Sequence, residues 1–171
     1  MNEFIKNLID NSIRKLVKND SFLLVHNASE RSIAHRLALY IEEDEWIYAN
    51  GYQVDCEYNR VGDGVLKKLH GLNIKYDEYG SLVYPDIIIH KRGQGPFSDL
   101  NHPCQNFLII EIKKSTSEVG DSDDVKKIDA YIEELGYLNG LAVKIFTGKD
   151  YKLHINKYKV TYEKINNKFG N

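Results

Sequence analysis

The 171-residue chain has the length of one domain, and its apolar content of 42% and charged content of 28% are ordinary for a packed globular core. Its net charge of −2 argues against a generic, strongly cationic nucleic-acid binder, although a local basic groove remains compatible with it. No window approaches the apolar length of a membrane span, and Glu3, Lys6 and Asp10 argue against a signal peptide.

Two amphipathic helices are predicted first, over residues 2–19 and 29–44, with a connector at 21–28. Ser29 is suited to cap the second helix, and Glu30 falls in its first turn, where the macrodipole favours an anion. The apolar stripe of this helix, extended back by one turn, also reaches Glu30. Glu30 is therefore either a helix-start acid or a carboxylate that faces the sheet.

Residues 52–59 alternate between apolar and polar side chains and predict a strand. Its polar face carries Asp55 and Glu57, which are more often solvated than catalytic but remain secondary site candidates. Residues 60–82 are rich in glycine and partly basic, so we expect a long loop with a short helix there.

Charged residues interrupt two isoleucine-rich strands that are predicted over 84–90 and 106–114. Asp86 lies in the first strand, and Glu111 and Lys113 lie in the second. A buried charge is costly unless it is paired, hydrogen-bonded or bound to a metal. In an antiparallel hairpin that pairs residue 86 with 112, we expect Asp86 beside Glu111 and Lys113, which share one face. Two carboxylates and an ammonium at one place suit a divalent cation and a phosphate.

A third amphipathic helix is predicted over 121–136, followed by a strand at 141–147 that runs parallel to strand 106–114 through a right-handed crossover. Asp124, Lys127 and Tyr131 form a line beside the apolar stripe of this helix. The line is either a solvated face with a local ion pair, or it brings Lys127 and Tyr131 to the edge of the site. A turn at 148–150 and a strand pair, or one bent strand, over 151–163 complete the chain.

Pro85-Asp86 followed by Glu111-Ile112-Lys113, in this order of elements, resembles the PD-(D/E)XK nuclease superfamily. That superfamily includes type II restriction enzymes, Holliday-junction resolvases and lambda-type exonucleases. The resemblance covers residues 29–147 and implies a restriction endonuclease-like α/β fold with an αβββαβ core. A mixed central sheet would be flanked by helices, with an extra N-terminal helix and C-terminal strands, in a single domain over 1–171.

The resemblance also implies the roles of the site residues. Asp86 and Glu111 would bind Mg²⁺ or Mn²⁺ together with the Ile112 carbonyl, and Glu30 would bind the metal directly or through water. Lys113 would orient the attacking water and stabilise the charged phosphoryl oxygen, because a lysine beside two carboxylates should stay protonated. The alternative is that Asp86, Glu111 and Lys113 form only a structural ion pair.

Nucleic acid, expected to be DNA, would need basic side chains around such a site. Six that are close in sequence to the predicted active elements are Arg60, Lys67, Lys68, Lys91, Arg92 and Lys114, although each alone suits a solvated surface. The acidic segments 42–45 and 121–124 would then lie on the opposite side. No module for base readout is visible, so orientation on a duplex would come from loops, a partner or the homodimer that we expect.

Two functions therefore stay open. The first is a metal-dependent nuclease that hydrolyses phosphodiester bonds, in defence, restriction or repair. The second is a nuclease-fold protein with weak catalysis that acts as a nucleic-acid-binding or assembly module.

Cys56 and Cys104 lack C-x-x-C spacing and are typical of reduced thiols in a cytosolic protein. A zinc site from His90, His102 and Cys104 is a weaker alternative, since their spacing matches no common zinc finger.

Overall fold

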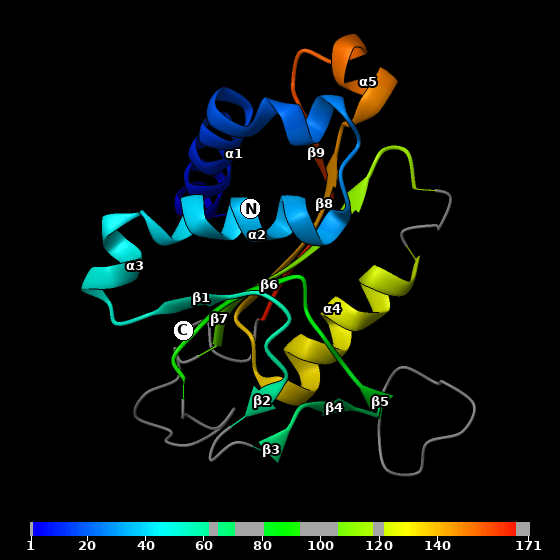
Figure 1. Cartoon of the computed structure of the whole chain (residues 1–171). Helices are drawn as coiled ribbons and strands as arrows, with labels where there is room; N and C mark the ends of the chain where they lie inside the picture. Colours follow the sequence, from blue (N-terminus) through cyan, green and yellow to red (C-terminus); the bar gives the residue numbers. More distant parts are fainter. Residues whose placement is uncertain (1, 62–64, 71–80, 93–105, 118–121, 167–171) are drawn as a thin grey trace.

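A five-stranded mixed sheet forms the centre of the protein in a computed structural model that describes residues 2–61, 65–70, 81–92, 106–117 and 122–166. The strand order is β1–β6–β7–β8–β9, with β7 and β8 parallel and the other neighbours antiparallel (Figure 1). The strands are β1 (Gln53–Asp55), β6 (Ile87–His90), β7 (Asn106–Lys114), β8 (Asn139–Ile145) and β9 (Tyr158–Ile165). The predicted mixed sheet and its parallel central pair are thereby confirmed.

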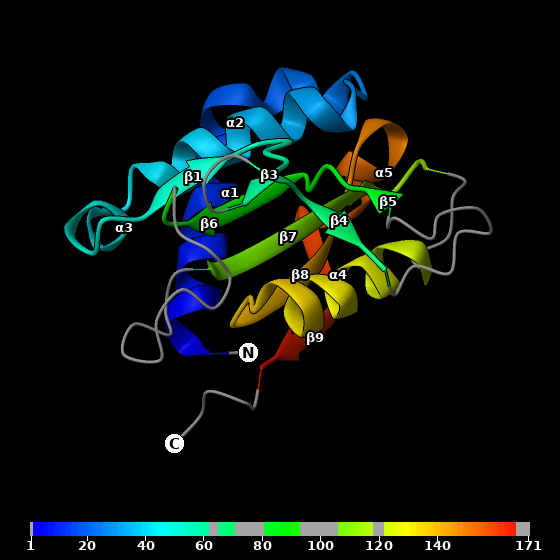
Figure 2. The same ribbon diagram turned by 90° about the horizontal axis from the view of Figure 1, so that it is seen from below.

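Helices cover both faces of this sheet (Figure 2). Those on one face are α1 (Glu3–Val25), α2 (Glu30–Glu42) and α3 (Glu45–Ala49), and α4 (Ser122–Leu135) lies on the other. Side chains alternate along β7, so Leu108 and Ile110 pack in the α1–α2 core while Ile109 packs against α4. No helix among the described residues is long and apolar enough to cross a membrane.

The N-terminal helices α1 and α2 follow the predicted pattern, but their ends differ, and the short helix α3 follows α2 where no element was predicted. Ser29 caps α2 by accepting the Ser32 N–H at 3.1 Å, as predicted. Helix α1 continues to Val25, through most of the segment that we expected to be a connector. It kinks at Asp20, whose φ of −127° and ψ of 26° are not helical. The apolar residues Leu23 and Leu24 pack on the core, and their burial carries the helix past the kink.

The segment predicted as a loop with a short helix contains short strands instead. They are β2 (Arg60–Val61), β3 (Val65–Leu66), β4 (Lys68–Leu69) and β5 (Ser81–Leu82), which pair as two small antiparallel sheets. Leu69 and Val83 are buried against α4 in the second core cluster. This packing fixes a stretch whose glycine content alone suggests a loop; residues 62–64 and 71–80 lie outside the described part.

The ends of two other predicted strands also differ. Strand β1 stops at Asp55, because Glu57 adopts a positive φ of 51° that breaks the extended backbone. The predicted turn at 148–150 and the start of strand 151–163 are replaced by a short helix, α5 (Gly148–Leu153). A bend at residues 155–157 precedes β9, and the pairing of β9 with β8 shifts register between Ala142 and Val143.

The register between β6 and β7 decides where Asp86 points. Ile87 opposes Ile110, so position 86, just before β6, continues to a place opposite Glu111. The predicted pairing of 86 with 112 was wrong by one residue and would have put Asp86 on the face of Ile112, because directly opposed residues share a face. The observed register brings Asp86 to the Glu111 face, on the side that α4 covers.

Candidate functional site

Asp86 and Glu111 meet where the β6–β7 pair passes under α4. Asp86 is half-buried, and one of its oxygens accepts the Ile112 N–H at 2.7 Å. Glu111 is 2% exposed, and its Oε2 lies 3.3 Å from Lys127 Nζ. Its Oε1 is buried and has no hydrogen-bond partner among the described residues. A buried carboxylate oxygen without a partner is costly, so this atom is suited to accept a proton, a hydrogen-bond donor or a cation.

Both carboxyl groups resist ionisation. Burial raises the pKa of Asp86 to about 6, and the charges of Glu30 and Asp124 add to the rise, while the Ile112 N–H and Lys127 oppose it. Burial raises the pKa of Glu111 to about 8, and the charge of Asp86 raises it further. The direction of both shifts means that this place favours either protons or an added positive charge.

Two lysines compensate the acids through a chain of ion pairs between β7 and α4. Lys113 Nζ lies 3.2 Å from Asp124 Oδ2, and Lys127 Nζ lies 3.8 Å from Asp124 Oδ1 and 3.3 Å from Glu111 Oε2. The ion-pair partner of Lys113 is therefore Asp124, and Lys127 is the cation that pairs with Glu111. Asp124 is buried and belongs to the site, so the expectation that the acids at 121–124 lie on the opposite side is wrong for this residue.

Tyr131 follows Lys127 by one helical turn and lies at the same place. It is fully buried, and its hydroxyl has no hydrogen-bond partner among the described residues. Burial raises its pKa, and the charge of Glu111 is the next contribution. A solvated face is wrong for Tyr131, which is buried, while the expected local ion pair between Asp124 and Lys127 is present. That Lys127 and Tyr131 flank an active cleft stays a prediction.

Glu30 lies at the border of this cluster. Its Oε1 accepts the Lys114 N–H at 3.2 Å, which ties the start of α2 to the end of β7. Burial is the main cause of the raised pKa of Asp86, and the charge of Glu30 is a smaller contribution to it. Glu30 is thus a helix-start acid that is also held near the other acids, and it is not a solvated residue far from them.

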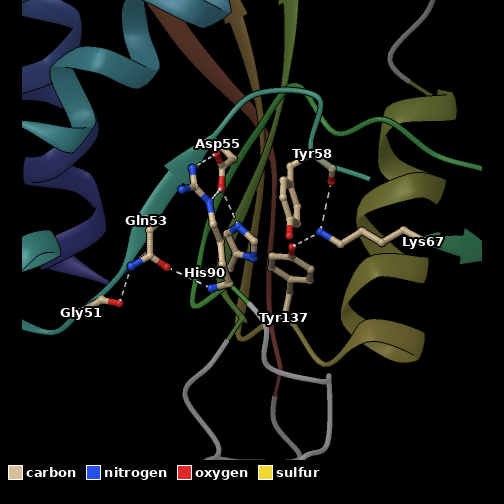
Figure 3. A network of polar contacts seen from close by, with 8 residues as sticks. Gly51, Gln53, Asp55, Tyr58, Lys67, His90 and Tyr137 are labelled. Atoms are coloured by element: carbon tan, nitrogen blue, oxygen red, sulfur yellow. Dashed lines mark hydrogen bonds and ion pairs between the residues drawn. The ribbon is translucent and has the colours of Figure 1, made fainter. Parts of the chain in front are cut away.

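Asp55, a secondary candidate, belongs to a different network (Figure 3). It opposes Ile88, so it lies on the face of the sheet that α4 covers. Its Oδ2 lies 2.8 Å from His90 Nε2 and accepts a hydrogen bond from Arg92 Nε at 2.8 Å. Burial opposes its charge, but these bonds from His90 and Arg92 hold the pKa of Asp55 far below its usual range. The hydrogen bonds of Asp55 go to His90 and Arg92. Among the described residues, no contact joins Asp55 to Asp86 or Glu111. His102 and Cys104, the other members of the alternative zinc site, lie outside the described residues.

Lys67 contradicts the prediction that it contacts phosphate. It is 1% exposed, and its Nζ donates to the Tyr58 carbonyl at 3.3 Å and to the Tyr137 hydroxyl at 3.0 Å. Figure 3 shows its side chain reaching between these two tyrosines. Burial lowers the pKa of Lys67 to about 7. A lysine enclosed in this way serves the fold and cannot meet a nucleic-acid backbone.

The other side chains that were predicted to contact phosphate differ in their exposure and in whether they already have a partner. Arg60 and Lys68 are exposed, and Arg92 is exposed but paired with Asp55. The ammonium of Lys91 lies 5.1 Å from the centre of the Tyr52 ring, over the α1–α2 side of the sheet. Lys114 Nζ donates to the Ala28 carbonyl at 3.1 Å, which holds it at the turn before α2.

The residues present fit a hard divalent cation in part. Asp86 and the partnerless oxygen of Glu111 offer two anionic ligands, and Mg²⁺ commonly binds through one or two carboxylates and keeps several waters. Among the described residues, no three His, Cys, Asp or Glu side chains converge as a preformed metal cage. The site therefore suits an ion that water or substrate oxygens help to coordinate.

Comparison with known proteins identifies no relative. No protein-family model matches the chain, and no curated protein or solved structure matches it.

Proposed function

We propose that this chain is a metal-dependent nuclease that hydrolyses phosphodiester bonds in DNA. The observation that carries the proposal is the partnerless, buried Glu111 Oε1 on the same sheet face as Asp86, with Lys113 and Lys127 bound into the same cluster. The order α2, β1, β6, β7, α4, β8 supports a restriction endonuclease-like core, with β2–β5 inserted before β6.

Asp86, Glu111 and the Ile112 carbonyl would hold Mg²⁺ or Mn²⁺, and Glu30 would act through water or through its charge on Asp86. When bound, such an ion would make a water nucleophilic and offset charge on the phosphoryl group. Lys113 stabilises the developing negative charge and orients the attacking water, because its ammonium is held at the site by Asp124. Lys127 favours the ionised form of Glu111 against burial and the charge of Asp86, since its ammonium is the direct partner of that carboxylate.

Tyr131 would support the same site from α4. Its hydroxyl is buried and available, so it can donate a hydrogen bond to a metal-bound water or to a carboxylate oxygen. A residue of this kind fixes the direction of a ligand oxygen without binding the metal itself.

The test is incubation of the protein with plasmid, linear double-stranded and single-stranded DNA, and with RNA, in Mg²⁺ or Mn²⁺. We expect cleavage of at least one DNA substrate that stops when a chelator is added. Open-circular plasmid products indicate endonuclease action, and shortening of linear DNA alone indicates exonuclease action. Absence of cleavage under every condition contradicts the proposal.

The second candidate is a binding or assembly module on the same fold. The observation that favours it is the pairing of Lys113 and Lys127 with Asp124 and Glu111, which is also what a purely structural network looks like. A divalent cation that raises the melting temperature without supporting cleavage would select this function. The expected homodimer stays a prediction, which light scattering with and without DNA checks.

A further inference from the structure

A small pocket opens next to Asp86, on the side where α2 meets the end of β1. Its volume is about 220 Å³, and it is lined by Arg31, Ala34, His35, Cys56, Glu57 and Asp86. Complete ligands of drug size occupy pockets of roughly 300–1,000 Å³, so this one suits a smaller group. Asp86 is common to this pocket and to the acidic cluster, so an occupant would adjoin whatever that cluster acts on.

Arg31 and Glu57 form the charged rim of this pocket. Arg31 Nε lies 2.6 Å from Glu57 Oε1, and the two side chains are 82% and 42% exposed. An ion pair this exposed is worth little, so a competing anion can replace Glu57 at small cost. The guanidinium suits a phosphate because it offers two parallel donors to its oxygens.

The local backbone holds Glu57 in this position. Glu57 adopts a left-handed φ of 51°, and its N–H donates to the Pro85 carbonyl at 2.8 Å. The residue is therefore anchored to the one that precedes Asp86, and its carboxylate faces Arg31 from across the pocket. Cys56 beside it is half-buried, and burial raises the pKa of its thiol to about 11, so it lines the pocket as a neutral group.

We infer that this pocket binds the phosphate of the nucleotide that adjoins the scissile phosphodiester, with Arg31 as its partner. The inference rests on the proposed nuclease function and adds a substrate subsite to it. In the free protein Glu57 is the ion-pair partner of Arg31. When the polynucleotide binds, its phosphate replaces Glu57 as the partner of Arg31. Arg31 is then a positioning residue, which sets how the substrate lies against Asp86.

The test measures binding of a fluorescein-labelled DNA 20-mer, single-stranded and duplex, by fluorescence anisotropy in chelator, where no cleavage occurs. We expect Arg31→Ala to weaken binding on the order of tenfold, as for one charge-assisted hydrogen bond. Its slope of log affinity against log salt should be shallower by about one, because one phosphate contact is lost. Glu57→Gln should bind more tightly than the parent, because the competitor of the phosphate is gone.

Arg14→Ala is the matched control, since it removes the same charge from an exposed position on α1 that does not line this pocket. It should leave the affinity and the salt slope close to those of the parent. The inference is overturned if Arg31→Ala and Arg14→Ala behave alike, or if Glu57→Gln weakens binding. When the parent still cleaves DNA in that case, only the subsite is lost and the proposed function stands. If the parent neither binds nor cleaves, both are lost.

Discussion

At the scale of single residues, Lys67 is the clearest case of a group whose surroundings oppose its charge. Burial lowers its pKa from the ordinary value of 10.5 to about 7. Between these two values the unfolded chain binds a proton at this position and the folded chain does not. Stability must therefore rise with pH over that interval, and the cost of protonating Lys67 is fully present below about pH 7.

Replacing Lys67 by Met removes this titration. We expect the unfolding free energy of Lys67→Met, minus that of the parent, to fall as pH rises from 7 to 10, because only the parent gains stability. The limiting slope is about 1.4 kcal/mol per pH unit. Urea unfolding at several pH values measures it, with Lys68→Met, an exposed neighbour, as the control that should show no such slope. Parallel curves for Lys67→Met and the parent would contradict the linkage.

Lys113 is expected to matter for both stability and catalysis. Lys113→Ala leaves the buried Asp124 with Lys127 as its remaining ion-pair partner in the described structure, which should destabilise the fold by roughly 1–3 kcal/mol. Cleavage should also fall by roughly 100-fold, because a cation at the transition state is lost. Thermal unfolding and cleavage rates measure the two effects.

The double variant Lys113→Ala with Asp124→Asn separates these effects. It removes the unpaired charge together with its partner, so much of the stability should return. Cleavage should stay low, because the ammonium is still missing. Recovery of cleavage along with stability would mean that Lys113 is only structural.

At the scale of elements, the position of α4 depends on one glycine in β8. A Cβ at Gly140 would lie 2.3 Å from Ile128 Cγ2 and 3.1 Å from Ile132 Cδ1, both on α4. Gly140→Ala should therefore push the helix away from the sheet and cost roughly 1–3 kcal/mol. The same shift moves Lys127 and Tyr131 from Glu111, so cleavage should fall more than the melting temperature explains.

Ile128→Ala in the same chain provides the control, because it removes the methyl group that collides. We expect the double variant to be more stable than the sum of the two single changes predicts, by a favourable coupling free energy. Additive losses would show that the two positions do not meet. Chemical denaturation of the four proteins gives all the terms of this cycle.

The helices and strands differ in how well the sequence predicts them. Strand β7 was predicted with its observed ends, and α4 within one residue, because apolar period and bounding residues agree there. Helices α3 and α5 and the strands β2–β5 were not predicted, because they are short and depend on packing rather than on a sequence pattern. Leu69 and Val83, for instance, are ordered by burial against α4, which no local period reveals.

Residues of the candidate site could be predicted from the sequence where a charged side chain interrupts an apolar pattern. Asp86, Glu111 and Lys113 stand out because each interrupts an apolar strand, whereas Asp124 sits on an amphipathic helix where acids are common. Only the way α4 lies on β7 shows that Asp124 is buried and paired with Lys113. The prediction that Lys67 contacts phosphate was wrong because a lysine in a glycine-rich segment is expected to be exposed. Only the structure shows the tyrosines that enclose it.

At the scale of the whole molecule, a divalent ion should act as a stabilising ligand. It would bind the folded arrangement of Asp86 and Glu111 and offset the two effects that raise the pKa of Glu111, which are burial and, after it, the charge of Asp86. At a concentration 100 times the dissociation constant, one such ion adds about 2.7 kcal/mol to stability. We expect Mg²⁺ or Mn²⁺ to raise the melting temperature of the parent.

Glu111→Gln should lose most of this stabilisation, because it removes one anionic ligand and keeps the size of the side chain. Without metal, it should be at least as stable as the parent, since the like-charge contact with Asp86 is gone. Glu133→Gln, which changes an exposed acid on α4, should keep the full response to metal. Differential scanning calorimetry with and without the ion distinguishes these outcomes, and equal shifts in all three proteins would indicate non-specific binding.

The most direct measurement is the rate at which Asp86→Asn and Glu111→Gln cleave DNA in Mg²⁺ or Mn²⁺, compared with the parent and with Glu133→Gln. Asp86 and Glu111 are the two acids that the fold brings to one face of the β6–β7 pair. We predict that each site variant loses roughly 100-fold or more in rate, while Glu133→Gln cleaves like the parent. If both site variants cleave DNA as fast as the parent, the chemistry takes place elsewhere and the assignment of the site is wrong.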